Sequence, residues 1–98
     1  MDYRDIVLTL AEVCMDRVKL DPDTTPQQAS DVARDIVNGV RDEFESKEMS
    51  MASEVVLDLT LTALDRAEVT FSEDPSTAGK EAAEAYLHIA EWWRNPDK

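Results

Sequence analysis

The sequence predicts an all-α fold, a compact four-helix bundle with antiparallel neighbours and short connections. The chain has two glycines and four prolines in 98 residues, too few for the many tight turns of a β-sandwich or barrel. Apolar residues recur at helical spacing in four segments, and residues that begin or end helices flank these segments. With 43% hydrophobic residues, the chain can build one core, so a single domain over residues 1–98 is expected.

The first helix is expected over residues 2–19. Asp2 and Asp5 lie in its first turn and Arg17 and Lys19 in its last, where their charges suit the helix dipole. Its apolar face comprises Tyr3, Ile6, Val7, Leu10, Val13, Cys14 and Val18. The stretch 21–24, which contains a proline, separates it from the next helix.

The second helix is expected over residues 26–47. Thr25 is a suitable N-cap, Pro26 fits the first helical position, and Gln28 can complete a capping box. The pair Asn38–Gly39 is a common turn signal, but the apolar period continues through it without a change of phase. One continuous helix with a close crossing at Gly39 is therefore expected, and a break into two shorter helices is the alternative. The apolar face comprises Ala29, Val32, Ala33, Ile36, Val37, Val40 and Phe44.

The third helix is expected over residues 51–71, with Ser46 or Ser50 as its N-cap. The alternation of leucine with polar residues over 57–61 would also fit a strand. A lone strand would have no partner in the chain, which favours a helix. Two apolar strips follow from the helical reading, Ala52, Val55, Val56, Leu59, Ala63 and Ala67 on one side and Leu57, Leu61 and Leu64 on another. A helix that is apolar on two sides is expected to be central and buried.

The fourth helix is expected over residues 77–94, after a turn at 73–76 and before a stop at Asn95–Pro96. Its inner face comprises Ala78, Ala82, Ala85, Tyr86, Ile89 and Trp93. Trp92 projects about 100° away from Trp93, either packing under the chain end or standing exposed as an anchor for a partner. Met49 and Met51, in the link between the second and third helices, are expected to pack within the linker, and a contact site for a partner is the alternative.

Charge is the strongest compositional signal, with 22 acidic residues against 10 basic ones and a net charge of −12. Such a chain should repel nucleic acid and anionic membranes and should attract basic protein surfaces. Solubility alone is the other explanation. Cys14 is the one cysteine, which fits a reducing compartment, and no signal peptide or membrane-spanning run is evident. A cytoplasmic location is expected.

The chain carries no catalytic motif, and we expect no metal, no cofactor and no enzymatic activity. His88 is the one histidine, and the stripe that it forms with Glu81, Glu84 and Glu91 lies opposite the inner face of its helix. The spacing of Asp21, Asp23 and Thr25 faintly resembles a calcium loop, but Pro26 occupies the position of the required glycine. Cys14 is expected to be a small buried core residue.

The second helix carries a row of carboxylates on its expected outer face, and neighbours three or four residues apart lie about 5–6 Å from one another. The residues predicted to bind a partner are Asp31, Asp35, Asp42, Glu45 and Trp92. In size and charge the chain resembles the small acidic proteins with which phages and mobile elements block host machinery, some of which imitate DNA. This resemblance implies an inhibitor that docks on a basic, nucleic-acid-binding host protein or defence complex. The alternative is a homodimeric subunit that associates through Trp92, Tyr3 or the second apolar strip of the third helix.

Overall fold

The computed structural model describes residues 2–47 and 52–94. Capping side chains mark the starts of its helices. Helix α1 spans Tyr3–Arg17, and Asp2 and Asp5 form a capping box at its start. Helix α2 spans Pro26–Ser46 and begins with the predicted capping box of Thr25 and Gln28. Helix α3 spans Glu54–Arg66 and helix α4 spans Pro75–Arg94. The all-α four-helix bundle predicted from the sequence is confirmed.

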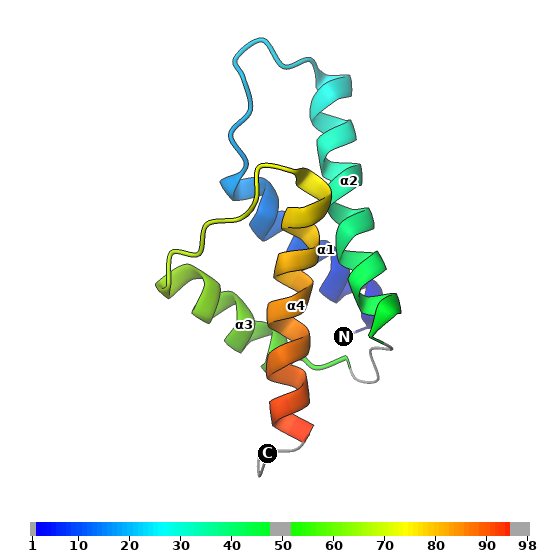
Figure 1. Ribbon diagram of the computed structural model, residues 1–98, viewed down its shortest axis with the longest axis vertical. Helices are drawn as coiled ribbons and strands as arrows, with labels where there is room; N and C mark the ends of the chain where they lie inside the picture. Colours follow the sequence, from blue (N-terminus) through cyan, green and yellow to red (C-terminus); the bar gives the residue numbers. More distant parts are fainter. Residues whose placement is uncertain (1, 48–51, 95–98) are drawn as a thin grey trace.

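Helices α2 and α4 follow the long axis of the molecule, and helices α1 and α3 cross them obliquely, in a roughly opposite direction (Figure 1). Helices α2 and α4 run in the same direction, and they form the most extensive pairing of the fold. The rings of Phe44 and Tyr86 meet edge to face at 5.6 Å along this pair. Helices α1 and α3 lie obliquely against it, and the molecule measures 50 × 26 × 20 Å.

Two glycines permit the close crossing of α2 and α4. A methyl group on Gly39 would overlap the backbone carbonyl of Ser76, and one on Gly79 would overlap that of Ile36. Both overlaps involve backbone atoms, which side-chain rotation cannot relieve. The expected crossing at Gly39 is confirmed, and α2 continues through Asn38–Gly39 without a break.

The core lies where α1 and α4 cover the inner face of α2. Its largest fully buried side chains are Tyr86, Phe44, Ile6, Leu10, Ile36 and Leu57. At roughly 1.5–3 kcal/mol for each large apolar side chain removed from water, these residues supply much of the force that holds the helices together. Thr60 is also fully buried, and its hydroxyl donates to the Val56 carbonyl at 2.8 Å, which satisfies it.

Helix α3 differs from the prediction in its bounds and its place. It begins after Ser53, whose hydroxyl accepts from the Val56 N–H, so neither Ser46 nor Ser50 caps it, and Ser50 lies outside the described residues. It ends at Arg66 rather than near residue 71. Within the described ranges it contacts α4 and α1 but not α2, so it is peripheral rather than central.

The two apolar strips of α3 are consequently not both buried. Leu57 and Leu64 face the core and Leu61 packs partly against it, so the second strip is the inner one. Of the first strip only Val56 is buried, whereas Val55 and Leu59 are exposed. The second strip is therefore covered within the chain, which removes it as the dimer contact considered above.

Helix α4 starts two residues earlier than predicted, at Pro75. The Asp74 carboxylate accepts from both the N–H and the hydroxyl of Thr77, at 3.0 and 2.7 Å. These hydrogen bonds hold the pKa of Asp74 below its ordinary value of 3.8. Asp74 and Pro75 thus form a cap and first turn, not the loop that the sequence suggested. The predicted stop at 95–96 lies outside the described residues, as do Met49 and Met51.

Candidate functional site

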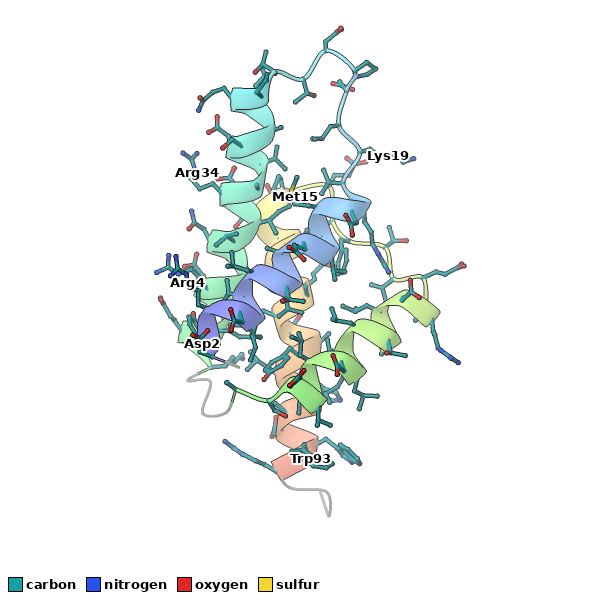
Figure 2. The ribbon with its side chains drawn as sticks, turned by 180° about the vertical axis from the view of Figure 1, so that it is seen from behind. Asp2, Arg4, Met15, Lys19, Arg34 and Trp93 are labelled. Carbon is teal, nitrogen blue, oxygen red and sulfur yellow. The ribbon has the colours of Figure 1, made fainter. Side chains whose placement is uncertain are left out.

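The predicted partner-binding carboxylates lie together on the outer side of α2. Asp42 and Glu45 are exposed, and Asp31 and Asp35 are half-buried. Arg34 reaches both of the latter, at 3.6 Å from Asp31 and 3.8 Å from Asp35, and Figure 2 shows it at the outer edge of α2. This arginine offsets part of the negative charge in the first half of the row.

The charge density of this row is well below that of DNA. Asp31, Asp35 and Asp42 extend over about 16 Å of helix, at 1.5 Å per residue. A DNA strand places one phosphate about every 3.4 Å. A single face of α2 therefore carries a diffuse negative field and does not reproduce the phosphate spacing of a strand.

The two tryptophans near the end of α4 are both half-exposed, Trp92 at 50% and Trp93 at 53%. Their rings lie 6.3 Å apart and tilt against each other. Trp93 was predicted to continue the buried face, and this prediction is wrong because α4 extends past the other helices at that end (Figures 1 and 2). Within residues 2–47 and 52–94, no other helix extends far enough along α4 to cover the Trp93 ring.

A second acidic region lies in α3 and the segment that returns from it to α4. Residues 53–74 contain one basic residue, Arg66, and six acidic ones, Glu54, Asp58, Asp65, Glu68, Glu73 and Asp74. All six acidic side chains are exposed. None of these six residues was among the predicted partner-binding residues, since α3 was expected to be a central, buried helix.

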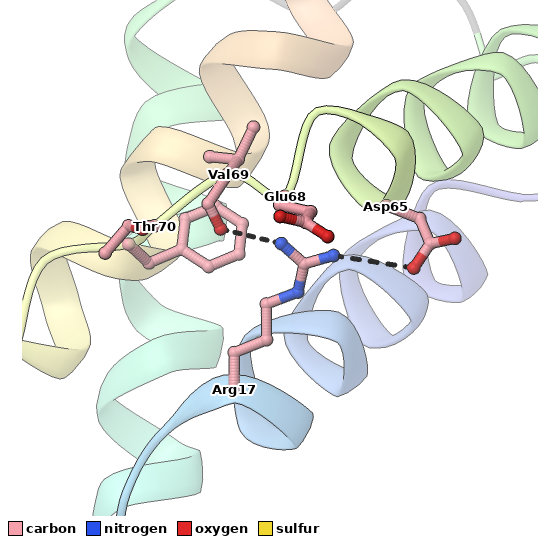
Figure 3. Close-up of a pocket in the computed structure, with 6 residues that line it drawn as sticks. Arg17, Asp65, Glu68, Val69 and Thr70 are labelled. Carbon is pink, nitrogen blue, oxygen red and sulfur yellow. Dashed lines mark hydrogen bonds and ion pairs between the residues drawn. The ribbon is translucent and has the colours of Figure 1, made fainter.

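Arg17 anchors the return segment to the end of α1 (Figure 3). Its guanidinium donates to the Val69 carbonyl at 2.7 Å and the Leu64 carbonyl at 3.2 Å, and lies 3.9 Å from the Asp65 carboxylate. It also sits over the Phe71 ring, 5.6 Å from its centroid. An open pocket of about 440 Å³ surrounds this group. Because the guanidinium already bonds two backbone carbonyls, its observed role is to hold the fold together.

The end of α3 explains why the helix stops before residue 71. The Val69 N–H bonds to the Leu64 carbonyl at 3.2 Å, and the Glu68 N–H bonds to the Asp65 carbonyl at 3.1 Å. This is the Schellman arrangement, which needs a left-handed residue and usually has glycine there. Glu68 takes that position with φ of 50°. The chain then turns back, and the Ser72 N–H donates to the Glu81 carboxylate at 2.8 Å.

The reactive side chains do not converge. Cys14 is fully buried, and its thiol donates to the Ala78 carbonyl at 3.5 Å. Burial and the negative charge of Glu81 raise the pKa of this thiol to about 11, so it stays protonated at neutral pH. His88 is exposed and lies ten residues beyond Ala78 on α4, about 15 Å along the helix. Glu81 is half-buried rather than in the solvent stripe predicted for it.

Within residues 2–47 and 52–94, no three His, Cys, Asp or Glu side chains come together in a way that could hold a metal ion. None of the helices in the same ranges has the length and apolarity needed to cross a membrane. Comparison of the chain with protein-family models, with curated proteins and with solved structures finds no match.

Proposed function

We propose that this protein is a non-enzymatic binding module that docks on a basic surface of a partner protein and thereby inhibits or regulates it. The observation that carries this proposal is the uncompensated charge of the surface. The chain has a net charge of −12, and no acidic side chain among the described residues is buried. A field of this sign accelerates encounter with positively charged partners and repels nucleic acid and anionic lipid.

The best-suited partner class is a protein that itself binds nucleic acid, because such proteins present contiguous patches of Lys and Arg. The carboxylates of α2, at Asp31, Asp35, Asp42 and Glu45, would steer the encounter at long range. Charge of this kind changes association rates more than the final affinity. Lasting contact needs buried apolar surface, which the half-exposed Trp92 can contribute.

The test starts with capture from an extract of the native host at about 0.1 M salt, followed by kinetics on the purified partner. The association rate constant should fall steeply as salt rises from about 0.1 M to 1 M, as the Debye length shrinks from about 10 Å to 3 Å. The Asp35→Lys/Asp42→Lys variant should associate several-fold more slowly at the lower salt, with little change in dissociation.

The matched control is Asp21→Lys/Asp23→Lys, which changes the net charge equally in the loop before α2. A smaller slowing in this control would locate the steering field on α2. Two results would contradict the proposal, namely a partner whose association rate ignores salt, or a stable homodimer that ignores basic partners.

A further inference from the structure

The outer face of α3 carries an apolar strip that nothing within the described chain covers. Val55 is 62% exposed and Leu59 is 49% exposed. They lie four residues apart, so their side chains are neighbours on the helix surface, about 5–6 Å from one another. Thr62, exposed three residues further on, continues the row. The strip points away from the buried Leu57 and Leu64 and hence away from α4 and α1.

A row of carboxylates borders this strip along one edge. Glu54, Asp58 and Asp65 follow one another at spacings of four and seven residues, which places them on one side of α3 next to the strip. All three are exposed. Asp65 lies 3.9 Å from the Arg17 guanidinium, and Arg66 is the one basic residue of the segment 53–74, so the negative charge of this edge is concentrated at Glu54 and Asp58.

We propose that the outer face of α3, defined by Val55, Leu59 and Thr62 with the flanking acidic row, is the contact surface for a basic amphipathic helix of the partner protein. This inference rests on the proposed function and specifies where docking occurs. A helix with leucine-like residues on one stripe and Lys or Arg beside it matches both the apolar row and its acidic edge. Side chains at spacings of four and seven residues form the row that a facing helix packs against, and here Val55 and Leu59 supply its apolar part.

Charge decides against the other occupants of this face. A second copy of the chain would bring two molecules of net charge −12 together, and their mutual repulsion disfavours association. An anionic membrane or a nucleic acid would meet the same repulsion. A basic amphipathic protein segment would be attracted by the acidic edge and would also bury apolar surface against the strip.

Other exposed apolar residues lack this combination. Leu8 on α1 is 47% exposed, but its neighbours four residues away are the charged Arg4 and Glu12. Trp92 and Trp93 form a tip at the end of α4, where the exposed Glu84 and Glu91 are followed by the basic Arg94, so the charge around them is mixed. The two tryptophans can enlarge a contact with a partner, but they do not indicate whether that partner is basic or acidic.

The test uses two synthetic helical peptides of about eighteen residues, long enough to lie along α3 at 1.5 Å per residue. One carries lysines with a stripe of leucines, and the other has the same lysines with alanines in place of the leucines. Each is titrated into the ¹⁵N-labelled protein at about 0.1 M salt. The leucine peptide should bind at least tenfold more tightly than the alanine peptide, and it should shift the amide signals of residues 54–66 more than those of α2.

The variant Val55→Ser/Leu59→Ser should bind the leucine peptide about tenfold to thirtyfold more weakly than the wild type does. Its affinity for the alanine peptide should be unchanged. Leu8→Ser is the matched control, because the two leucines are almost equally exposed, at 47% and 49%. It should leave both affinities unchanged. Both variants replace exposed side chains, and their thermal unfolding is measured alongside.

Equal affinity for the two peptides, or shifts that map to α2 or α4, would overturn this inference while leaving the proposed acidic docking function intact. Failure of both peptides to bind at about 0.1 M salt would count against both proposals. Sedimentation showing a dimer that Val55→Ser/Leu59→Ser dissociates would assign the face to a second copy instead.

Discussion

The substitution Gly79→Ala tests the close crossing of α2 and α4. In a solvent-facing helical position this change would stabilise the fold by about 1 kcal/mol, since alanine has the higher helix propensity. Here the added methyl group would overlap the Ile36 carbonyl oxygen and lie 3.0 Å from the Val40 nitrogen, against an ordinary contact distance of 3.4–4 Å. The helices must therefore separate by roughly 1 Å, and a gap of this size forfeits about a quarter to a half of each dispersion contact it affects.

We expect Gly79→Ala to be destabilised by about 1–3 kcal/mol after the gain in propensity, the range typical of overpacked cores. For a domain of this size, this corresponds to a fall in Tm of about 5–20 °C. Circular dichroism during heating and during urea titration measures the change. Asn38→Ala, on the exposed side of α2, is the control and should unfold at or slightly above the wild-type temperature. A Tm for Gly79→Ala at or above the wild-type value would refute the crossing geometry.

Three further changes address other parts of the fold. Glu68→Gly should raise stability by about 0.5–1 kcal/mol, because glycine adopts the left-handed conformation without steric cost, and a lower Tm would argue against this helix end. Arg17→Met should cost about 1.5–3 kcal/mol in urea unfolding, since two backbone carbonyls lose a charged donor, and an unchanged midpoint would show that they find other partners. Asp74→Asn should lower Tm at pH 7. Because the pKa of Asp74 in the folded protein lies below 3.8, the stability that its carboxylate contributes is present above that pH and is lost on acidification. The difference in Tm between the variant and the wild type should therefore shrink towards pH 2. A difference in Tm that does not change with pH would contradict this reasoning.

Residues with a local signature were predicted well. The capping box of Thr25 and Gln28 depends on residues three apart, and the apolar period of α2 is regular enough to continue through Gly39. Gly39 itself indicated a close crossing, because a glycine inside a long helix needs a packing reason. The partner in that crossing, around Ser76 and Gly79, could not be identified, since it depends on tertiary contact.

The errors concern α3 and the end of α4, where the sequence pattern leaves more than one arrangement open. Two apolar strips on α3 are compatible with a helix buried on both sides and with a helix that has one side exposed to solvent. Only the packing of the other helices distinguishes the two arrangements. The early end of the helix was hidden because Glu68, not glycine, takes the left-handed position. Trp93 follows the inner direction of its helix, but direction alone does not say whether another helix extends far enough to cover it. The outer face of α3 was missed for the same reason.

The pairing of α2 with α4 has a consequence for how the chain folds during synthesis. The glycines that fit the two helices together lie about forty residues apart, so α2 leaves the ribosome several seconds before its main partner at about 5–20 residues per second. Throughout that interval Ile36, Val40 and Phe44 have only α1 to shield them. The nascent protein therefore cannot complete its core until α4 has been synthesised. Shortened chains that stop before α4 should be targets for chaperones and proteases.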